Sequence, residues 1–333
     1  MALGKLSHED LNKFVIGHLK KNRYETITGP AVGEDCACLL VGGQNLVLST
    51  DPITAGGAHA GTLAVTVCCN DIAATGATPL AMMVTLLCPP HMTGKDIAAV
   101  MQQMQEAAQT LGVDIVGGHT EWTDAVTRLV ISTTVIAHAT GTSIQSGGMQ
   151  PGDTLIVTKS AGLEGTAILA HECNRYLLSV CGEPVVREGA GYLSLLSVLP
   201  EGLLAAQTPG THAMHDATEG GILGAAWEMA HASDCGLRLN DSAIPVTPAT
   251  RAVCQALGID PLGLISSGAM LIATANPHEL LSALSGRGIN ATVIGRAVTA
   301  SRGMTLEDGT TLPPPKKDAL YQALQQYKNP SLV

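Results

Sequence analysis

The sequence of 333 residues predicts an α+β protein of two domains. In both halves of the chain, apolar β-branched runs alternate with stretches of helical periodicity, the pattern of domains that pack helices against sheets. A segment rich in Gly, Ser and Pro, GTSIQSGGMQPGD, separates the halves. Hydrophobic residues make up 46% of the chain and charged residues only 14%, which suffices for two buried cores. We place the domains at 1–149 and 150–333.

The first half predicts three helices and three strands. The pattern HEDLNKFVIGHLKK predicts a helix over 8–21 with Ser7 as its N-cap. The clearest helix covers 96–111, where apolar residues recur at i, i+3, i+4 and i+7, and a helix of small residues with one apolar face covers 60–75. The expected strands are LVLSTD, VDIV running into the segment GGHTEWTD, and TRLVISTTVIA.

The second half repeats this alternation in outline. A strand DTLIVT opens it, and the motif HDATEGG precedes a helix that runs to residue 232. The strands GLRL, MLIAT and ATVIGR then alternate with helical segments.

Composition and charge exclude several classes of function. The net charge is −10, no run of Lys or Arg is present, and aromatic residues make up 2%, so we expect no nucleic-acid partner. No segment has the apolar length of a membrane span or the core of a signal peptide, which favours a cytoplasmic protein without membrane contact. The nine cysteines form no CxxC motif, and Cys36, Cys68 and Cys69 are expected to be small buried hydrophobic residues.

Acidic residues stand where a helix or a strand gives way to a loop, and they predict a Mg²⁺ site. Mg²⁺ takes a few carboxylates and leaves positions for phosphate oxygens. A turn or a helix cap is the alternative role for each of these residues singly. Asp71 is the exception, because it lies in an otherwise apolar helix where a buried, unpaired carboxylate is costly. The predicted metal ligands are Glu34, Asp35, Asp51, Asp71 and Glu121.

Glycines near these acids favour nucleotide phosphates. Gly33, Gly117 and Gly118 allow backbone amides to approach a phosphate closely. In the second half, Asp216 and Thr218 precede Gly220 and a helix N-terminus, whose dipole favours an anion. Asp71 and Asp216 are the predicted catalytic residues.

Other signals leave alternatives open. The motifs of P-loop, dinucleotide-binding, zinc-protease and serine-hydrolase enzymes are absent. The pair His171 and Glu172, and the group of His212, His215 and Asp216, suit a metal, but satisfied or exposed histidines are the alternative.

Seven motifs occur in order across nearly the whole chain: GEDCA, STDPIT, NDIAATGATPL, GGHTE, PGDTLIVT, HDATEGG and IGRAV. As a set they resemble the superfamily of aminoimidazole ribonucleotide (AIR) synthetase, thiamine-monophosphate kinase, selenophosphate synthetase and the hydrogenase-maturation protein that makes the cyanide ligand of the nickel-iron site. The resemblance is closest to the hydrogenase-maturation (HypE-like) branch, and within it to proteins called AIR synthase related.

The resemblance implies an AIR-synthetase-like fold. Strands of the N-terminal domain would pair with a second subunit into an intersubunit β-barrel, making a homodimer, and the C-terminal domain would be an α/β sandwich. ATP would lie in the groove between the domains, with its phosphates held through Mg²⁺. Asp35, Asp51, Asp71 and Asp216 match acidic residues of the family motifs, and Glu34 replaces a first Asp.

The motif GGHT departs from the family, which carries an Asp after the two glycines. The resemblance places His119 and Thr120 with Gly117 and Gly118 at the nucleotide, and Glu121 would restore the lost carboxylate. An imidazole accepts later first-row metals, so we expect Mn²⁺ to serve at least as well as Mg²⁺. The alternative is that His119 caps the turn or contacts adenine or ribose.

A second departure concerns the terminal cysteine that carries the thiocarboxamide in the hydrogenase-maturation protein. This sequence ends KNPSLV and its last cysteine is Cys254, so we expect no such chemistry at a C-terminal thiol.

The resemblance therefore implies an ATP- and Mg²⁺-dependent enzyme that transfers a phosphoryl group to an oxygen of a small-molecule substrate. A kinase like the thiamine-monophosphate enzyme is one alternative. A nucleotide-binding protein that assists in the maturation of a partner protein, without turnover, is the other.

Overall fold

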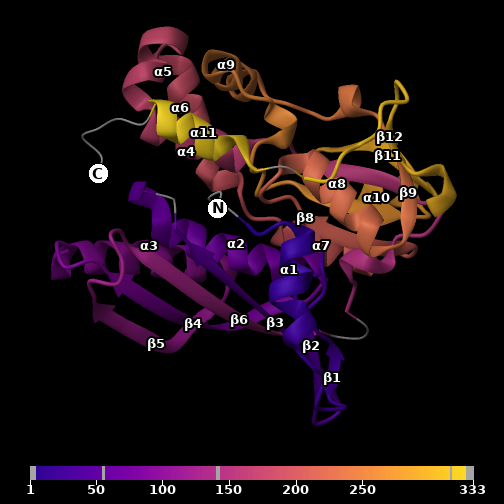
Figure 1. The fold of residues 1–333 in the computed structure, drawn as a ribbon, viewed down its shortest axis with the longest axis horizontal. Coiled ribbons are helices and arrows are strands. Elements are labelled where there is room, and N and C mark those ends of the chain that lie inside the picture. The colour runs from indigo at the N-terminus through magenta and orange to yellow at the C-terminus, as the bar shows by residue number, and fades with distance from the viewer. Residues whose placement is uncertain (1–4, 55–56, 140–142, 316, 328–333) are drawn as a thin grey trace.

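Two six-stranded sheets organise the chain into two α+β domains (Figure 1), as predicted. The computed structural model describes residues 5–54, 57–139, 143–315 and 317–327. The first sheet has the order β1-β2-β3-β6-β4-β5 and the second β12-β9-β11-β7-β10-β8. The strands are β1 Thr26–Thr28, β2 Ala37–Val41, β3 Gln44–Ile53, β4 Thr78–Cys88, β5 Asp114–Trp122, β6 Val130–Ala139, β7 Thr154–Thr158, β8 Thr211–Asp216, β9 Cys235–Leu239, β10 Met270–Thr274, β11 Ala291–Thr299 and β12 Met304–Leu306.

Helices cover one face of the first sheet. α3 (Gly94–Leu111) begins with a capping box between Thr93 and Asp96 and ends at Gly112, whose φ of 69° suits glycine. α2 (Ala60–Ala74) lies between the sheet and the second domain, packing on β3, β6 and α7 (Leu199–Gln207). Nearly every residue of α2 is therefore buried, not only those of one face as the sequence suggested.

Two elements begin or end at residues other than those predicted. Ser7 caps α1 as predicted, its Oγ accepting from the amide of Asp10 at 3.1 Å, but α1 covers only His8–Phe14 and a short 3₁₀ turn follows. The segment GGHTEW is part of strand β5, because it pairs in parallel with β4 along its length. Tertiary pairing thus overrides the weak strand propensity of its glycines.

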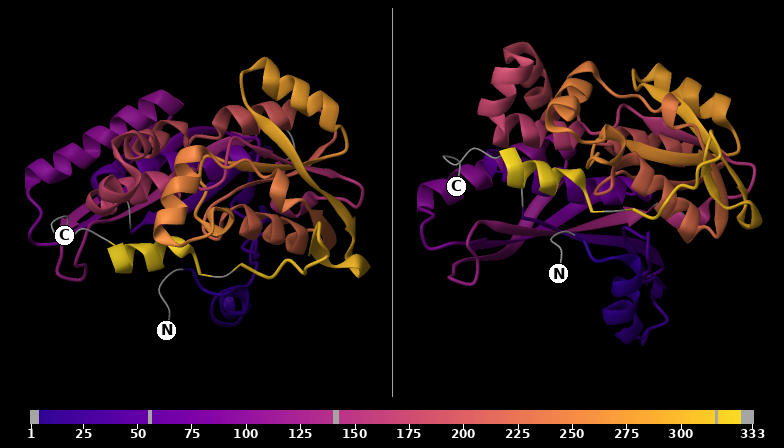
Figure 2. Two further views of the ribbon diagram at one scale, coloured as in Figure 1. Left: turned by 90° about the horizontal axis from the view of Figure 1, so that it is seen from above. Right: turned by 45° about the horizontal axis from the view of Figure 1, so that its top comes forward.

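Three helices of the C-terminal half pack on the second sheet, namely α7 Leu199–Gln207, α8 Gly221–Ala232 and α10 Pro277–Gly286. The other helices of this half pack against one another in a separate cluster; they are α4 Leu163–Glu172, α5 Asn174–Cys181, α6 Glu183–Gly191, α9 Pro248–Leu257 and α11 Ala319–Tyr327. The chain returns from β12 along the molecule to place α11, yellow in Figure 2, against α4. β8 is an edge strand of this sheet and the strand nearest to α2.

Specific hydrogen bonds hold the two domains together. The side-chain amide of Asn70 on α2 donates to the carbonyl of Leu196 at 2.8 Å and accepts from the amide of Val198 at 2.9 Å. Within the first domain, the amide of Ile144 donates to the carbonyl of Thr75 at 3.1 Å and so anchors the segment that leads to the second domain at the end of α2. These contacts fix how β8 faces α2, and so they position the site described below.

Among the residues that the structure describes, no single helix is long and apolar enough to cross a bilayer. One pair bent by 48°, Glu183–Leu195 with Leu199–Gln207, satisfies the criterion only when taken together. Cys36, Cys68 and Cys69 are buried thiols, as predicted.

Candidate functional site

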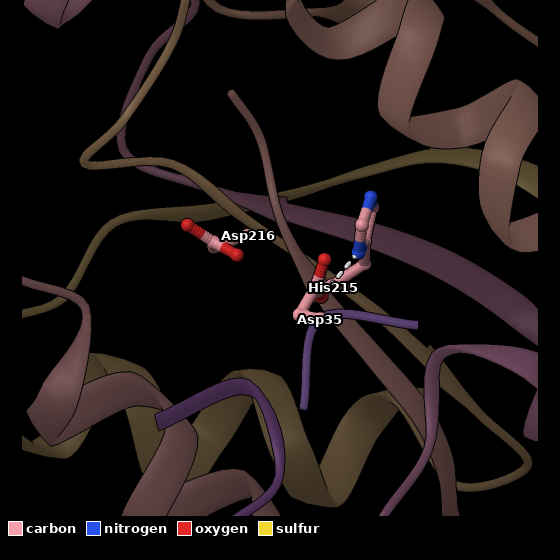
Figure 3. A group of neighbouring side chains, drawn as sticks. All are labelled: Asp35, His215 and Asp216. Carbon is pink, nitrogen blue, oxygen red and sulfur yellow. Dashed lines mark hydrogen bonds and ion pairs between the residues drawn. The ribbon is translucent and has the colours of Figure 1, made fainter. Parts of the chain in front are cut away.

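Three side chains from distant parts of the sequence meet where the two domains face each other (Figure 3). Asp35 precedes β2 of the first sheet, and His215 and Asp216 end β8 of the second. One ligand atom from each of the three lies within 4.8 Å of the others. The structure therefore brings together two of the predicted acidic residues, Asp35 and Asp216.

His215 holds Asp35 in place. Its Nδ1 lies 2.6 Å from Oδ2 of Asp35, and its Nε2 lies 3.2 Å from Oε2 of Glu228 on α8. Burial would lower the pKa of His215, but these two carboxylates raise it well above its usual range. Both ring nitrogens are thus engaged as donors of an imidazolium, so His215 positions the carboxylates and is not itself a metal ligand.

Asp216 has the opposite environment. Its side chain is 1% exposed, and neither carboxylate oxygen has a hydrogen-bond partner among the described residues. Burial, and next the charge of Asp35, raise the pKa of Asp216 to about 8. Figure 3 shows its carboxylate beside the pair of Asp35 and His215, with no hydrogen bond drawn to either. Since buried polar groups are nearly always paired, this carboxylate is suited to a ligand.

Two further predicted acids complete the acidic cluster, which we define as Asp35, Asp51, Asp71 and Asp216. Asp71 on α2 accepts a hydrogen bond from Ser49 of β3. Burial raises the pKa of Asp71 well above its usual range, and the other three carboxylates raise it further. Burial also raises the pKa of Asp51, with Asp35 adding to the shift. The four carboxylates therefore repel one another, and a cation would relieve that repulsion.

The residues of this cluster fit Mg²⁺. All four offer hard carboxylate oxygens, the ligands that Mg²⁺ prefers, and the two oxygens of Asp216 have no competing partner among the described residues. Asp216, Asp35, Asp51 and Asp71 are the residues that would hold it.

Lys5 reaches the same region from the N-terminus. Its Nζ lies 3.2 Å from Oγ1 of Thr218 and donates to it, and its backbone amide donates to Oε2 of Glu219 at 3.3 Å. Burial would lower the pKa of Lys5, but Glu228, Asp51, Glu219 and Asp35 raise it. Neither Lys5 nor Glu228 was singled out in the sequence, because neither lies in a motif; the contacts of Lys5 with Thr218 and Glu219 also span more than 200 residues.

A pocket of about 600 Å³ opens beside the acidic cluster, between the domains. Its polar lining includes Asp51, Thr218, Glu164 and Ser267, and its apolar lining comes from both domains. Burial raises the pKa of Glu164 to about 7. The predicted groove between the domains is therefore present, and Glu164 and Ser267 are functional candidates that the sequence analysis missed.

Other predicted residues of the first half lie next to the cluster in supporting roles. Oε1 of Glu34 accepts from the amide of Gly147 at 3.2 Å, so it ties the segment after β6 to the loop before β2. A Cβ on Gly33 would lie 3.2 Å from that of Ala232, at the end of α8. Gly33 thus permits close packing on α8 within one chain.

Thr218 and Gly220, the two residues of the second half predicted to bind nucleotide, have different environments. Thr218 lines the pocket and contacts Lys5. The amide of Gly220 donates to Oδ2 of Asp318 at 2.9 Å, so this amide is already paired. The helix N-terminus that the sequence suggested for phosphate is therefore partly occupied by Asp318.

The predicted residues of β5 are not brought to the acidic cluster within one chain. Register places Pro52, Ser132, Thr85 and His119 side by side across the first sheet, which puts His119 three strands, or about 14 Å, from β3. Because Ser49 and Asp51 point toward α2, the alternation of side chains points His119 to the opposite face. Its Nε2 lies 3.3 Å from Oε2 of Glu121, and both side chains are exposed.

Their neighbours Gly117, Gly118 and Thr120 share this remote strand. A Cβ on Gly118 would overlap the backbone of Val84, so this glycine permits the close approach of β4. Within one chain, none of the five β5 residues predicted at the site contacts the pocket or the acidic cluster; they are Gly117, Gly118, His119, Thr120 and Glu121. His119 of the same chain therefore cannot ligate a cation in the cluster, and the predicted preference for Mn²⁺ would require a β5 strand from a second copy.

The other histidines that the sequence singled out, His171 and His212, contact residues outside the acidic cluster. Nδ1 of His212 lies 2.9 Å from the carboxylate of Asp153. The rings of His59 and His171 lie 4.3 Å apart, and burial lowers the pKa of each. The alternative of satisfied histidines therefore holds for His212 and His215.

Comparisons with known proteins agree with this fold. A hydrogenase expression/formation protein of Methanocaldococcus jannaschii is 29% identical over 92% of both chains. The carbamoyl dehydratase HypE of Escherichia coli is 32% identical over 79% of both, and a crystal structure of E. coli HypE, described as a hydrogenase maturation protein, matches 84% of this chain and 88% of its own with a TM-score of 0.72. Structures of HypE with ATP and of a HypE–HypF complex share the fold at 22% and 23% identity, with TM-scores of 0.68 and 0.67.

The family model described as "AIR synthase related protein, N-terminal domain" matches residues 33–139, and the model of the C-terminal domain of the same family matches residues 150–307. Both matched regions contain residues of the acidic cluster, Asp35 and Asp216 among them. With these two domains and a HypE relative more than 30% identical over most of its length, the chain belongs to the family of AIR synthase-related proteins.

Proposed function

We propose that this protein is an ATP- and Mg²⁺-dependent enzyme that transfers a phosphoryl group to an oxygen of a small molecule. The observation that carries the proposal is the carboxylate of Asp216, which is buried and without a hydrogen-bond partner among the described residues, facing three other carboxylates at the junction of the domains. Such a cluster is costly by itself and favourable around a cation bound to phosphates. The HypE structure with ATP supports the choice of nucleotide.

Each residue of the site has a distinct part in this chemistry. Mg²⁺, when bound, neutralises charge on the transferring phosphoryl group. The acidic cluster holds the cation, and His215 fixes the orientation of Asp35 through its bond of 2.6 Å. Lys5 lies where its ammonium group can contact a phosphate oxygen beside Thr218.

We also propose that the protein is a homodimer formed through the open face of the first sheet. Large apolar side chains lie exposed on β4 and β5, namely Leu80, Met83 and Val116. A patch of this kind on a sheet is typical of an interface between copies. The face also carries His119 and Glu121, which would then lie between the subunits. Light scattering at micromolar concentration tests this, and a monomer would contradict it.

Two other functions remain as alternatives within the family. A small-molecule kinase would use the same cluster and release a phosphorylated product. A nucleotide-binding maturation partner would bind ATP without turnover. The HypE–HypF complex, in which a protein of the same fold is bound to a second protein, supports the association with a partner.

Nucleotide binding and turnover separate these alternatives. Calorimetric titration should show ATP binding that requires Mg²⁺ and is lost in Asp216→Asn. Asp153→Asn is the matched control, because Asp153 is also a buried aspartate of the second domain but pairs with His212. A metabolite screen for ATP consumption, read by phosphorus NMR, then identifies the acceptor. ATP binding that ignores both Mg²⁺ and Asp216 would contradict the proposal.

A further inference from the structure

Two histidines from different domains lie together at the end of α2 that is remote from the acidic cluster. His59 ends the 3₁₀ turn η2 (Gly57–His59) just before α2, and His171 lies in the last turn of α4. Their ring centroids are 4.3 Å apart, and the ring planes are inclined by 54°. The rise of α2 from His59 to Asp71 is about 18 Å. The two rings, which we call the His59–His171 pair, therefore lie outside the site described above.

Close packing of η2 on α4 brings the two rings together. Gly57 has a φ of 47°, which suits glycine, and a Cβ there would overlap Oε1 of Glu172 on α4. Glycine at this position thus lets the turn lie directly on the end of the helix. Leu63, in the first turn of α2, is buried in the same hydrophobic cluster as Ala167 of α4. Both contacts hold the first domain against α4 at this point.

A small cavity of about 10 Å³ lies at the two rings. That is about the space of a single water molecule or metal ion. The rest of its wall is Glu172 and four apolar side chains, namely Leu63, Ala167, Ile168 and Leu193. Among the residues that the structure describes, none forms a hydrogen bond with a ring nitrogen of His59 or His171. The ring nitrogens thus have no competing partner in this part of the chain.

The electrostatic surroundings suit a cation held by neutral imidazoles. Burial lowers the pKa of both histidines, and the neighbouring ring of His171 lowers the pKa of His59 further. Both rings are therefore neutral at pH 7, which is the form that binds metals. The charge of Glu172 acts in the opposite direction on His171. A carboxylate that favours a cation, and that can orient a ligating histidine, is thus already in place.

We propose that the His59–His171 pair binds a late first-row divalent cation such as Zn²⁺, with water in the remaining coordination positions. Imidazole nitrogen suits Zn²⁺, whereas Mg²⁺ prefers the oxygens of the acidic cluster. Two imidazoles on one tetrahedral Zn²⁺, at Zn–N distances of about 2.0–2.1 Å, have ring centroids roughly 5 Å apart. The present 4.3 Å is close to that spacing, and both rings are only half-buried, so they can rotate to reach it. Because each domain supplies one ligand, the cation stabilises the junction of the domains.

Zinc titration of the full chain tests this site without nucleotide. Calorimetry at pH 7 in excess Mg²⁺ should show Zn²⁺ binding that His59→Phe and His171→Phe remove, since Phe keeps a ring but has no ligand nitrogen. Each variant should weaken this binding by at least about 100-fold, because even the loss of an outer-shell partner costs about 10–100-fold. The double variant should lose no more than either single variant, since both rings hold one ion. Zn²⁺ binding that survives either substitution would overturn the proposal.

A matched control and a second readout complete the test. His138→Phe should leave Zn²⁺ binding unchanged, because His138 is also half-buried but lies on β6, beside Leu46 and Thr78. Zn²⁺ should raise the melting temperature of the wild type and of this control, because an ion that binds only the folded state stabilises it. The two ligand variants should show no such rise. If they retain it in full, Zn²⁺ acts elsewhere on the chain and the proposal fails.

Discussion

Two pairs of histidine and carboxylate lie on opposite faces of the first sheet, and they differ chiefly in burial. His215 is 4% exposed and lies 2.6 Å from Asp35, whereas His119 is 62% exposed and lies 3.3 Å from Glu121. The buried imidazole has a strongly raised pKa because it lies between two carboxylates. An exposed ion pair contributes only about 0–1 kcal/mol. The comparison teaches that the same two residue types build a site on one face and a solvated surface on the other.

The largest effect should come from the buried face. Asp71→Asn removes a carboxylate from the acidic cluster and should lower ATP turnover by about 100-fold or more, while Asn keeps the shape that accepts from Ser49. Metal-free protein should melt at the same or a higher temperature, because burial and the carboxylates of Asp51 and Asp216 already disfavour the charged form of Asp71, and Asn is neutral at every pH. Phosphate release and calorimetry measure the two results. Unchanged turnover would remove Asp71 from the site.

Substitution of the two histidines compares the faces directly. His215→Gln leaves Asp35 and Glu228 without their shared cation, and it should reduce the free energy of unfolding by about 3–5 kcal/mol. His119→Gln should change it by no more than about 0.5 kcal/mol. Urea unfolding at pH 7 measures both. Equal losses would show that burial is not what distinguishes the pairs.

The pH dependence of stability should reveal the buried carboxylates. The folded pKa of Asp216 is about 8, against about 3.9 in the unfolded chain, so the folded state holds more protons between these values. The stability of metal-free protein should therefore fall as pH rises from about 4 to 8. Asp216→Asn should flatten this slope. Thermal melts in EDTA across that range provide the measurement, and a rising stability would contradict the assignment.

The smallest effect concerns metal preference. If each chain builds its own cation site, His119→Asp should leave the ratio of Mn²⁺- to Mg²⁺-supported ATP turnover unchanged, because His119 lies across the sheet from Asp51. A shift toward Mg²⁺ would instead show that a second copy brings β5 to the cluster, as the β-barrel resemblance implies. Either result sharpens the comparison of the two faces.

Sequence patterns predicted most of the fold, because the signals were local. The periodicity over 96–111 predicted α3 within two residues, and the run of β-branched residues predicted β6. β5 was harder, because the extension of VDIV through GGHTEW depends on pairing with β4. The uniform burial of α2 also depends on the second domain, which no local pattern reveals.

The site was predicted only in part, because only some of its residues lie in local sequence motifs. Asp35, Asp51, Asp71 and Asp216 each stand in a motif, and the structure gathers all four. Lys5, Glu228 and Glu164 stand in no motif, and their roles come from contacts between distant segments. His119 and Glu121 were placed by resemblance to a motif, but the alternation of strand side chains decides their face, and that requires the register of three strand pairs.

The burial of α2 on all sides limits how this protein can change. Asn70 forms hydrogen bonds to the backbone of the second domain, while the next residue, Asp71, is part of the acidic cluster. One residue inserted before them would turn both by about 100° around the helix axis. Single substitutions can therefore adjust the cluster, whereas any change of length within Ala60–Ala74 would disturb the domain junction and the cluster together. Insertions and deletions in natural variants should accordingly fall outside this helix.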